Sequence, residues 1–195
     1  EGRFAADVTF PHQLHMRVVR AQSAHGILRA VDAGAALALP GVAAVWTHAD
    51  VADVPPIDFR LTKIAGLDPY RQYVLARDRV RYVGEPIALV FADDAYVAED
   101  AADLIEPEIE DLPVNLDAAG PLSQFDDTHK SEPAVIRKGY GDVDAAFRAA
   151  DHVIELELAV GRHSGVPLET RGANARYDAA RDILEMHGAA KVPHW

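Results

Sequence analysis

The clearest pattern of hydrophobic and polar positions in this chain runs over residues 80–113. Within it, the continuous apolar run 87–92 is typical of a strand that is covered on both faces. Apolar residues then recur at helical spacing over 94–105 with acidic residues between them, and two aspartates are placed to cap the start of this helix. We therefore predict a strand, a helix that Pro107 ends, and a second strand after it.

The residues before this stretch predict further short elements of a mixed α+β unit. An Ala- and Leu-rich helix over 33–39 follows Asp32 and is stopped by Pro40. Residues 51–72 contain several Pro and Gly residues with little periodicity, which indicates a long loop that is functional or docked on a partner. The candidate strands are residues 16–21 and 27–31, joined by a turn at 23–26, and residues 42–47.

The composition changes after residue 117, and this change predicts a second unit. Residues 118–140 are rich in Gly, Pro, Ser, Asp and Lys without apolar periodicity, as expected of a linker. Asp142 is then placed to cap a helix, and residues 154–160 alternate like a strand with one face in the core. Two further short strands are predicted over residues 173–177 and 183–187.

We expect this second unit to be poorly packed by itself or to be stabilised by another copy of the chain. Only about 55 residues follow the linker, which is too few to bury a good hydrophobic core. The apolar face of the strand predicted over 154–160 would otherwise be exposed to water.

The net charge and the absence of cysteine exclude several classes of function. A formal net charge of −12 argues against non-specific nucleic-acid binding, which needs a surplus of Lys and Arg, and disfavours anionic membranes. Without cysteine, the chain has no disulfide, zinc–thiolate site or iron–sulfur ligation of its own. No transmembrane segment or signal peptide is visible, so we expect a cytoplasmic protein. Because the chain runs from Glu1 to Trp195 without a closing element, we also expect a piece of something longer, from which a leader could have been removed.

Two pairs of residues have spacings found in metal-binding or catalytic sites, but their context favours a structural role. His12 and His15 are three residues apart, as metal ligands on a helix can be, yet Pro11 and the strand that follows argue against a helix. No carboxylate or third histidine is placed by spacing to complete a metal site. His163 and Ser164 suggest a base and a nucleophile, but adjacent residues on a strand point to opposite faces. We therefore predict no metal ligand and no catalytic residue here.

The segment HSGVPLETRG, residues 163–172, leaves two interpretations open. Glu169 and Arg171 lie two residues apart, would share one face of a strand, and are able to form an ion pair with backbone partners. The segment either takes part in a site or orders the junction between the two units. The chain contains no phosphate-loop or G-x-G-x-x-G motif and no G-x-S-x-G elbow.

Six separated motifs together resemble one protein family. They are GRFAAD at 2–7, VVRAQSAHGI at 18–27, PGV at 40–42, VRYVGEP at 80–86, GDVDAAF at 141–147 and PLETRG at 167–172. In order and spacing they are similar to the large subunit of the molybdenum hydroxylases, the group of xanthine dehydrogenase, aldehyde oxidase and aerobic carbon monoxide dehydrogenase. Each motif is weak by itself, whereas six in the right order over essentially the whole chain are specific.

The resemblance implies a fold class, a domain organisation and a set of cofactors. It implies an α+β chain with a hammerhead-like α/β domain over 1–117, a linker over 118–140 and the truncated beginning of the first molybdopterin-binding domain over 141–195. It also implies molybdenum and molybdopterin in the full-length protein, iron–sulfur clusters and FAD on partner subunits, and no cofactor in this chain by itself. The reaction implied is hydroxylation of a carbon centre in a small organic substrate with oxygen derived from water. Homo-oligomerisation stays open.

One position is implied to bind the cofactor. In the family, a Thr-Gln-x-Pro-like sequence places a Gln near the oxo group of the metal, and the matching stretch here is GAAKVPH at 188–194. Ala190 and Lys191 occupy the aligned positions, so a cation on a long stem replaces a neutral amide. This departure at Lys191 weighs against ordinary xanthine-type chemistry.

The resemblance places the main catalytic elements outside this chain. The Gly-rich cofactor loop of the family and the Glu that acts as base beside the metal align beyond Trp195, and metal catalysis needs a shaped pocket and a base within reach. We therefore expect the chain to be inactive in isolation, with no catalytic residue of its own. The alternative is a non-catalytic scaffold or interaction module that kept the fold, which Lys191 favours.

Overall fold

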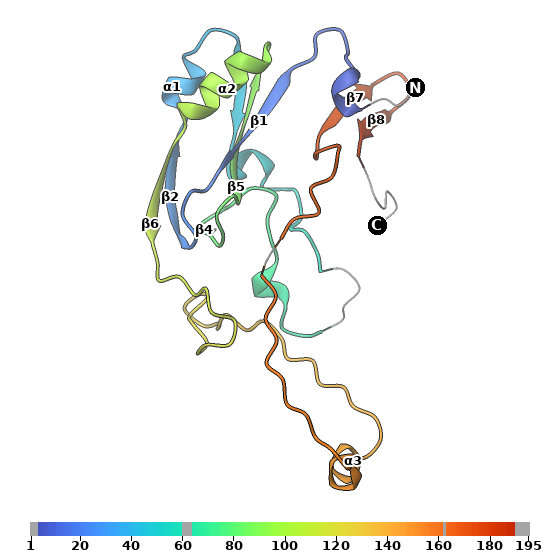
Figure 1. Ribbon diagram of the computed structural model, residues 1–195. Coiled ribbons are helices and arrows are strands. Elements are labelled where there is room, and N and C mark those ends of the chain that lie inside the picture. Colours follow the sequence, from blue (N-terminus) through green and yellow to red (C-terminus); the bar gives the residue numbers. More distant parts are fainter. Residues whose placement is uncertain (1–3, 60–63, 162, 190–195) are drawn as a thin grey trace. The chain divides into compact units, whose positions relative to one another are not determined.

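The computed structural model describes residues 4–59, 64–161 and 163–189, which divide into two compact units (Figure 1). The larger unit spans residues 12–136, and the smaller unit combines the residues up to Pro11 with those from Arg137 onward. Strands and short helices occur in both units, so the predicted α+β class is confirmed.

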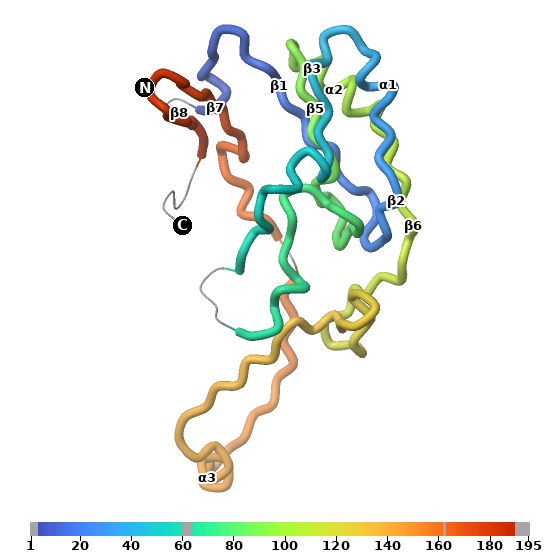
Figure 2. Tube along the Cα trace, turned by 180° about the vertical axis from the view of Figure 1, so that it is seen from behind, coloured from blue at the N-terminus to red at the C-terminus, as the bar shows by residue number. Residues whose placement is uncertain are grey.

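The larger unit contains two three-stranded sheets in which all neighbouring strands are antiparallel. The first sheet has the order β1–β5–β3, and the second has the order β4–β2–β6. The strands are β1 (His15–Arg20), β2 (Gly26–Asp32), β3 (Val42–Trp46), β4 (Arg79–Val80), β5 (Pro86–Ala92) and β6 (Glu106–Asp111). The helices α1 (Gly34–Leu37) and α2 (Ala95–Asp103) contact each other and the first sheet (Figure 1, Figure 2). Two short 3-10 helices are η2 (His48–Val51) and η3 (Asp68–Tyr70).

The hydrophobic core of the larger unit surrounds β5, the strand predicted over 87–92. Val90 is fully buried in a cluster with Ala36 of α1 and Ala101 of α2. Ile87 is fully buried in a second cluster that draws on β2 and β4. Because β5 buries side chains against the helices and against the second sheet, its continuous apolar run is explained and the predicted burial on both faces is confirmed.

Helix α2 begins after a predicted capping residue. The Asp94 side chain accepts hydrogen bonds from the backbone N–H groups of Tyr96 at 2.8 Å and Val97 at 3.4 Å. These are donors that the start of a helix leaves without an internal partner. The helix ends at Asp103, with Leu104 as its C-cap, and is therefore shorter than predicted.

One detail of the prediction for this unit is wrong. Pro107 does not end the helix but lies inside β6, where it pairs with Val31. A proline is tolerated there because β6 is an edge strand, in which one side of the backbone needs no strand partner. The strands predicted over 16–21 and 27–31 form as β1 and β2, and they lie in different sheets.

The smaller unit contains few regular elements. They are the 3-10 helix η1 (Ala5–Asp7), the helix α3 (Val143–Ala149) and the antiparallel hairpin of β7 (Ala173–Asp178) and β8 (Ile183–Gly188). Asp142 caps α3 as predicted, because its side chain accepts a hydrogen bond from the Ala145 N–H at 2.8 Å. Both predicted hairpin strands are confirmed. None of the described residues in this unit is buried.

The strand predicted over 154–160 does not form. The segment runs on from α3 as an extended trace (Figure 1), but no strand pairs with it among the described residues. Its apolar side chains are exposed. A β-strand needs a neighbour that bonds its backbone N–H and C=O groups, and an alternating pattern within one segment does not supply that neighbour.

Candidate functional site

Three side-chain hydrogen bonds hold the N-terminal segment, one from Glu169 and two from Asn174 of β7. Glu169 Oε1 accepts a hydrogen bond from the backbone N–H of Ala5 at 2.7 Å. The Asn174 side-chain amide donates to the carbonyl oxygens of Ala5 at 2.5 Å and Val8 at 3.1 Å. The motif GRFAAD, which contains Ala5, is thus bound to the motif PLETRG, which contains Glu169.

Aromatic and charged side chains surround this contact. The guanidinium carbon of Arg176 stands 5.0 Å from the centre of the Phe10 ring, whose centre lies 5.7 Å from that of the His187 ring. Arg176 also pairs with Glu185 across the hairpin, with 3.0 Å between Nε and Oε2. This hydrogen bond, together with the positive charges of Arg176 and Arg181, lowers the pKa of the Glu185 carboxyl group.

The side chains around this contact line a cavity of about 670 Å³ in the smaller unit. Its charged residues Glu169, Arg176 and Glu185 each have a hydrogen-bond partner, so their charges hold the segment and the hairpin together. No serine, threonine or lysine is present among its described lining residues. Across residues 4–59, 64–161 and 163–189, no group of three or more His, Asp and Glu side chains is placed to hold a metal ion.

Lys191, the residue predicted to bind the cofactor, lies outside the described residues, as does Ala190. The strand β8 precedes Lys191 in the sequence and ends at Gly188. The role of Lys191 therefore stays a prediction.

The ion pair that Glu169 and Arg171 are able to form is not present among the described residues. The Glu169 carboxylate is bonded to the Ala5 N–H, and within the described part of the chain Arg171 has no ion-pair partner. Residues 163–172 form no strand, so alternate positions do not share a strand face. Residues 163–172 thus bind the N-terminal segment through Glu169. This contact joins residues far apart in the sequence, and the local sequence pattern does not reveal it.

The histidines considered as ligands or bases lie in separate local arrangements. His163 Nδ1 is 3.2 Å from the carbonyl oxygen two residues before it, while Ser164 Oγ accepts from the N–H two residues after it at 3.3 Å. His15 begins β1, and His12 has a backbone φ of 58°, which is incompatible with a right-handed helix. The helical geometry that a histidine pair at this spacing would need is therefore absent at these two residues.

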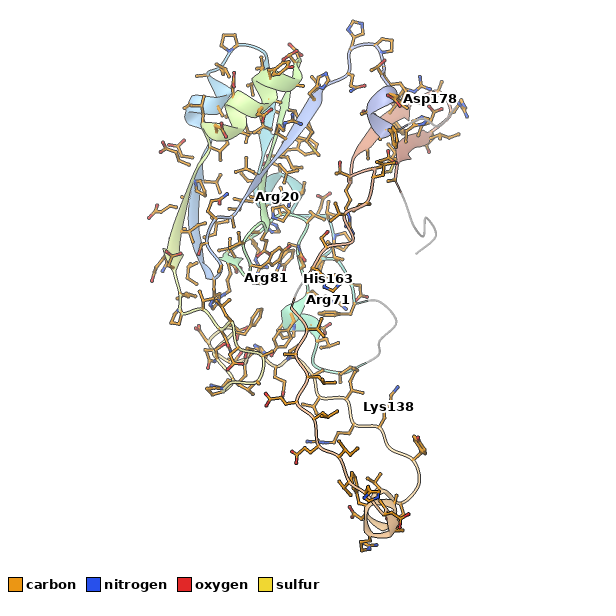
Figure 3. The ribbon with its side chains drawn as sticks, in the orientation of Figure 1. Arg20, Arg71, Arg81, Lys138, His163 and Asp178 are labelled. Atoms are coloured by element: carbon orange, nitrogen blue, oxygen red, sulfur yellow. The ribbon has the colours of Figure 1, made fainter. Side chains whose placement is uncertain are left out.

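A buried ion pair in the larger unit was missed by the sequence reasoning. Within the motif VRYVGEP, Glu85 is fully buried and Arg81 mostly buried. The Arg81 Nε donates to Glu85 Oε1 at 3.0 Å, and the Arg81 backbone N–H donates to Oε2 at 2.6 Å. Arg81 Nη1 donates to the Arg71 carbonyl oxygen at 2.9 Å. Both arginines are labelled in Figure 3. The pair therefore satisfies a buried charge and ties two loops together, which gives this motif a structural meaning.

A cavity of about 440 Å³ in the larger unit is lined by Arg71, Arg77, Arg79 and Arg81. Three of these arginines form ion pairs with carboxylates of the same unit, so most of the positive charge is neutralised. Arg79 instead has His25 Nε2 at 3.4 Å and no carboxylate partner among the described residues. Its guanidinium is able to bind a carboxylate or phosphate group. The alternating sequence RDRVR over 77–81 is a signal from which this group of arginines could have been predicted. Alternate residues of an extended segment share a face, so the three arginines of this stretch lie on the same side.

Comparison with known proteins matches almost the whole chain. Residues 1–113 match the family described as aldehyde oxidase and xanthine dehydrogenase, a/b hammerhead domain, and residues 126–195 match the molybdopterin cofactor-binding domain. The chain is 40% identical, over 97% of its length, to the 6-hydroxypseudooxynicotine dehydrogenase complex subunit gamma of Paenarthrobacter nicotinovorans. It is 36% identical, over its full length, to the nicotine 6-hydroxylase large subunit of the same organism. It covers 25% and 24% of these two relatives.

Solved structures share the fold as well. The quinoline 2-oxidoreductase from Pseudomonas putida 86 matches with a TM-score of 0.81 at 32% identity, over 97% of this chain and 25% of that chain. A Cu,Mo-CO dehydrogenase matches with a TM-score of 0.77 at 30% identity, over 96% of this chain and 25% of that chain.

A hammerhead domain followed by a molybdopterin-domain match defines a class, the large subunits of molybdenum hydroxylases. This chain belongs to the aldehyde oxidase and xanthine dehydrogenase family, as the six motifs predicted. The chain spans about a quarter of the length of the curated relatives that it matches. The family consists of molybdenum oxidoreductases, and one relative is a subunit of a multi-subunit complex. Within the described residues, no helix is both long and apolar enough to cross a membrane.

The cavity beside the β7–β8 hairpin does not fit a cofactor of the size of molybdopterin. A cofactor of this size needs a concave pocket that encloses most of its surface. In the smaller unit no described residue is buried, and the cavity beside the hairpin is lined by charges that already have partners. We therefore assign no catalytic step to residues of this part of the chain.

Proposed function

We propose that this chain is the opening part of the molybdopterin-binding large subunit of a molybdenum hydroxylase. The complete enzyme hydroxylates a carbon centre of a small organic substrate with oxygen derived from water. The observation that carries the proposal is the double family match, in which a hammerhead domain precedes a molybdopterin cofactor-binding domain. Relatives named for nicotine and quinoline make a nitrogen-containing aromatic ring the first substrate class to test.

The proposed organisation follows the sequence. Residues 1–117 form the hammerhead-like domain, residues 118–140 the linker, and residues 141–195 the beginning of the first molybdopterin-binding domain. Molybdenum and molybdopterin are bound by the complete subunit, and an iron–sulfur subunit and an FAD subunit carry the electrons away in the cytoplasm. The absence of cysteine in this chain, and a relative that is named as one subunit of a complex, support separate partner subunits.

In this proposal the chain is inactive in isolation and has a structural role. The larger unit supplies a stable scaffold around β5, and the smaller unit supplies the β7–β8 hairpin that leads to Lys191.

Metal analysis and an activity assay of the complete enzyme test the proposal. The full-length large subunit is produced together with its partner subunits, and its molybdenum content is measured. We expect molybdenum in the purified complex and transfer of heavy oxygen from labelled water into a nitrogen-containing aromatic substrate. The 195-residue chain alone, assayed in parallel, should give no product. A properly assembled complex without molybdenum would overturn the enzymatic proposal.

A non-catalytic scaffold that kept the fold is the second candidate, because Lys191 replaces the amide that the family resemblance implies. The substitution Lys191→Gln in the full-length protein tests the position, with Lys138→Gln as a control of equal charge change. If Lys191 contacts the cofactor, Lys191→Gln changes molybdenum retention or turnover and Lys138→Gln changes neither. A protein that holds no molybdenum in either variant or in the wild type is a scaffold.

A further inference from the structure

The segment that follows α3 has an apolar face without a partner. Its four alternating apolar residues are Ile154, Leu156, Leu158 and Val160, which are 80%, 75%, 85% and 87% exposed. Glu155 and Glu157 stand between them. Because alternate residues of an extended segment share a face, one face of this segment is apolar and the other is acidic.

The backbone of this segment also lacks partners. No backbone hydrogen bond joins residues 152–160 to any other described residue, and no strand pairing includes them. An extended segment with unpaired N–H and C=O groups is a template for the addition of another strand. The alternating pattern and the unpaired backbone therefore point to the same missing neighbour.

The apolar surface continues onto α3. Val143 and Phe147 are each more than half exposed, and together with Val153 and Ile154 they line a largely apolar cavity of about 860 Å³. The surface thus combines a strand edge with a hollow that is able to hold a bulky apolar side chain of a partner.

We propose that residues 153–160 form a β-strand that pairs with a strand from the part of the large subunit outside this chain. The partner strand is apolar on the face that it shares with Leu156 and carries Lys or Arg on the other face, beside Glu155 and Glu157. This inference rests on the proposed function. The chain spans only about a quarter of the length of its relatives, so the remaining length is the source of the strand.

A second copy of this chain fits the face less well. Antiparallel pairing of residues 154–160 with their own copy puts Glu157 directly opposite Glu157, and like charges in that position are destabilising. The net charge of −12 adds repulsion between two copies. A strand of complementary charge from the same subunit avoids both costs.

Hydrogen exchange of the full-length large subunit, in its complex, tests the pairing. Peptides that cover residues 153–160 are followed by mass spectrometry, and peptides of β5 report whether the protein is folded. We expect residues 153–160 to exchange roughly a hundredfold or more slowly than an unstructured peptide, as amides in a paired strand do. Exchange at the unstructured rate, in a sample whose β5 is protected, overturns the proposal.

Two further measurements test whether the partner of residues 153–160 is a strand of the same subunit or a second copy of the chain. Leu156→Glu should abolish the protection of residues 153–160, whereas Glu157→Gln, on the opposite face, should retain it. Because Leu156→Glu could prevent folding, the exchange of the wild-type protein at successive dilutions is measured as well. Protection that is independent of concentration supports a strand from the same subunit, and protection that disappears on dilution shows a second copy and overturns the proposal.

Molybdenum content measured on the same samples keeps the two proposals apart. Molybdenum together with unprotected residues 153–160 means that the strand pairing is wrong while the proposed function stands. Protected residues without molybdenum mean that the pairing is right while the enzymatic function is wrong.

Discussion

The backbone N–H of Ala5 donates a hydrogen bond to Glu169 Oε1 over 2.7 Å, although 164 positions separate the two residues in the sequence. Asn174 adds two hydrogen bonds to the same N-terminal segment, at Ala5 and Val8. The motifs GRFAAD and PLETRG, which stand near opposite ends of the chain, thus form one contact. The first residues of the chain therefore belong structurally to the unit that holds the β7–β8 hairpin.

Removal of the Glu169 carboxylate should release the N-terminal segment. In the full-length protein, Glu169→Ala should destabilise this contact by about 1 kcal/mol, because the Ala5 N–H loses an acceptor that water replaces only in part. Faster hydrogen exchange or proteolysis at residues 4–8 would report the release. Glu169→Gln keeps an acceptor oxygen and should recover much of the protection, while Arg171→Gln should have no effect. Equal effects of Glu169→Ala and Arg171→Gln would show that the contact is unimportant.

The Arg81–Glu85 pair should be worth much more to stability than an exposed pair. Glu85→Gln leaves the mostly buried Arg81 guanidinium without its countercharge, and we expect a loss of about 3–5 kcal/mol in the free energy of unfolding. The matched control is Glu110→Gln, which breaks the exposed pair with Arg29 and should cost about 1 kcal/mol or less. Urea unfolding of both variants measures the difference, and similar midpoints would contradict the role assigned to Glu85.

Acid should weaken the turn at residues 126–129 within a defined range of pH. The Asp126 carboxylate accepts hydrogen bonds from the backbone N–H groups of Thr128 and His129 and is hydrogen-bonded to the His129 side chain. These hydrogen bonds, that of the Thr128 N–H above all, lower the pKa of Asp126 from 3.8 to about 2. Because the pKa in the folded protein lies below the unfolded value, this stabilisation is fully present above pH 3.8 and is lost as the pH falls towards about 2.

The acid sensitivity of the turn can be measured with a pair of neighbouring variants. Asp126→Asn should reduce the dependence of stability on pH between 3.8 and about 2, since the amide that replaces the carboxylate does not titrate there. Asp127→Asn is the control, because no hydrogen bond of the described structure involves the Asp127 side chain. Urea unfolding midpoints across this range would show the difference, and identical pH profiles for the two variants would rule out the assignment to Asp126.

The start of α2 should depend on one of two adjacent aspartates. Asp94→Ala removes the acceptor for the Tyr96 and Val97 N–H groups and should destabilise the larger unit by about 1 kcal/mol. Asp93→Ala changes the same charge one residue earlier and should cost much less, since the Asp93 side chain does not cap the helix. Thermal unfolding of the two variants distinguishes them, and a larger loss for Asp93→Ala would contradict the capping assignment.

Elements whose signals are local were predictable. Asp94 and Asp142 cap helices because their short side chains accept hydrogen bonds from backbone N–H groups two or three residues later. A few neighbouring positions of the sequence are therefore enough to predict these caps. The apolar run of β5 and the two strands of the β7–β8 hairpin were readable for the same reason. Pro107 misled the prediction because a proline stops a helix and also fits an edge strand, and the choice depends on which strand lies beside it.

The candidate site was predictable only in part. The arginines around Arg79 follow an alternating pattern that could have been noticed, whereas nothing near Glu169 indicates that its partner is the N–H of Ala5. Residues 154–160 have the pattern of a strand, yet no strand pairs with them among the described residues, and the pattern within one segment does not reveal this.

Local sequence patterns established the α+β class, the helix caps, the apolar centre of β5 and, through six ordered motifs, the family. The tertiary structure alone decided that β1 and β2 lie in different sheets, that Glu85 is buried against Arg81, and that Glu169 holds Ala5. The physical reason is the range of the interactions. Capping and periodicity act between neighbouring residues, while strand pairing, charge burial and a hydrogen bond between distant residues depend on how the whole chain returns on itself.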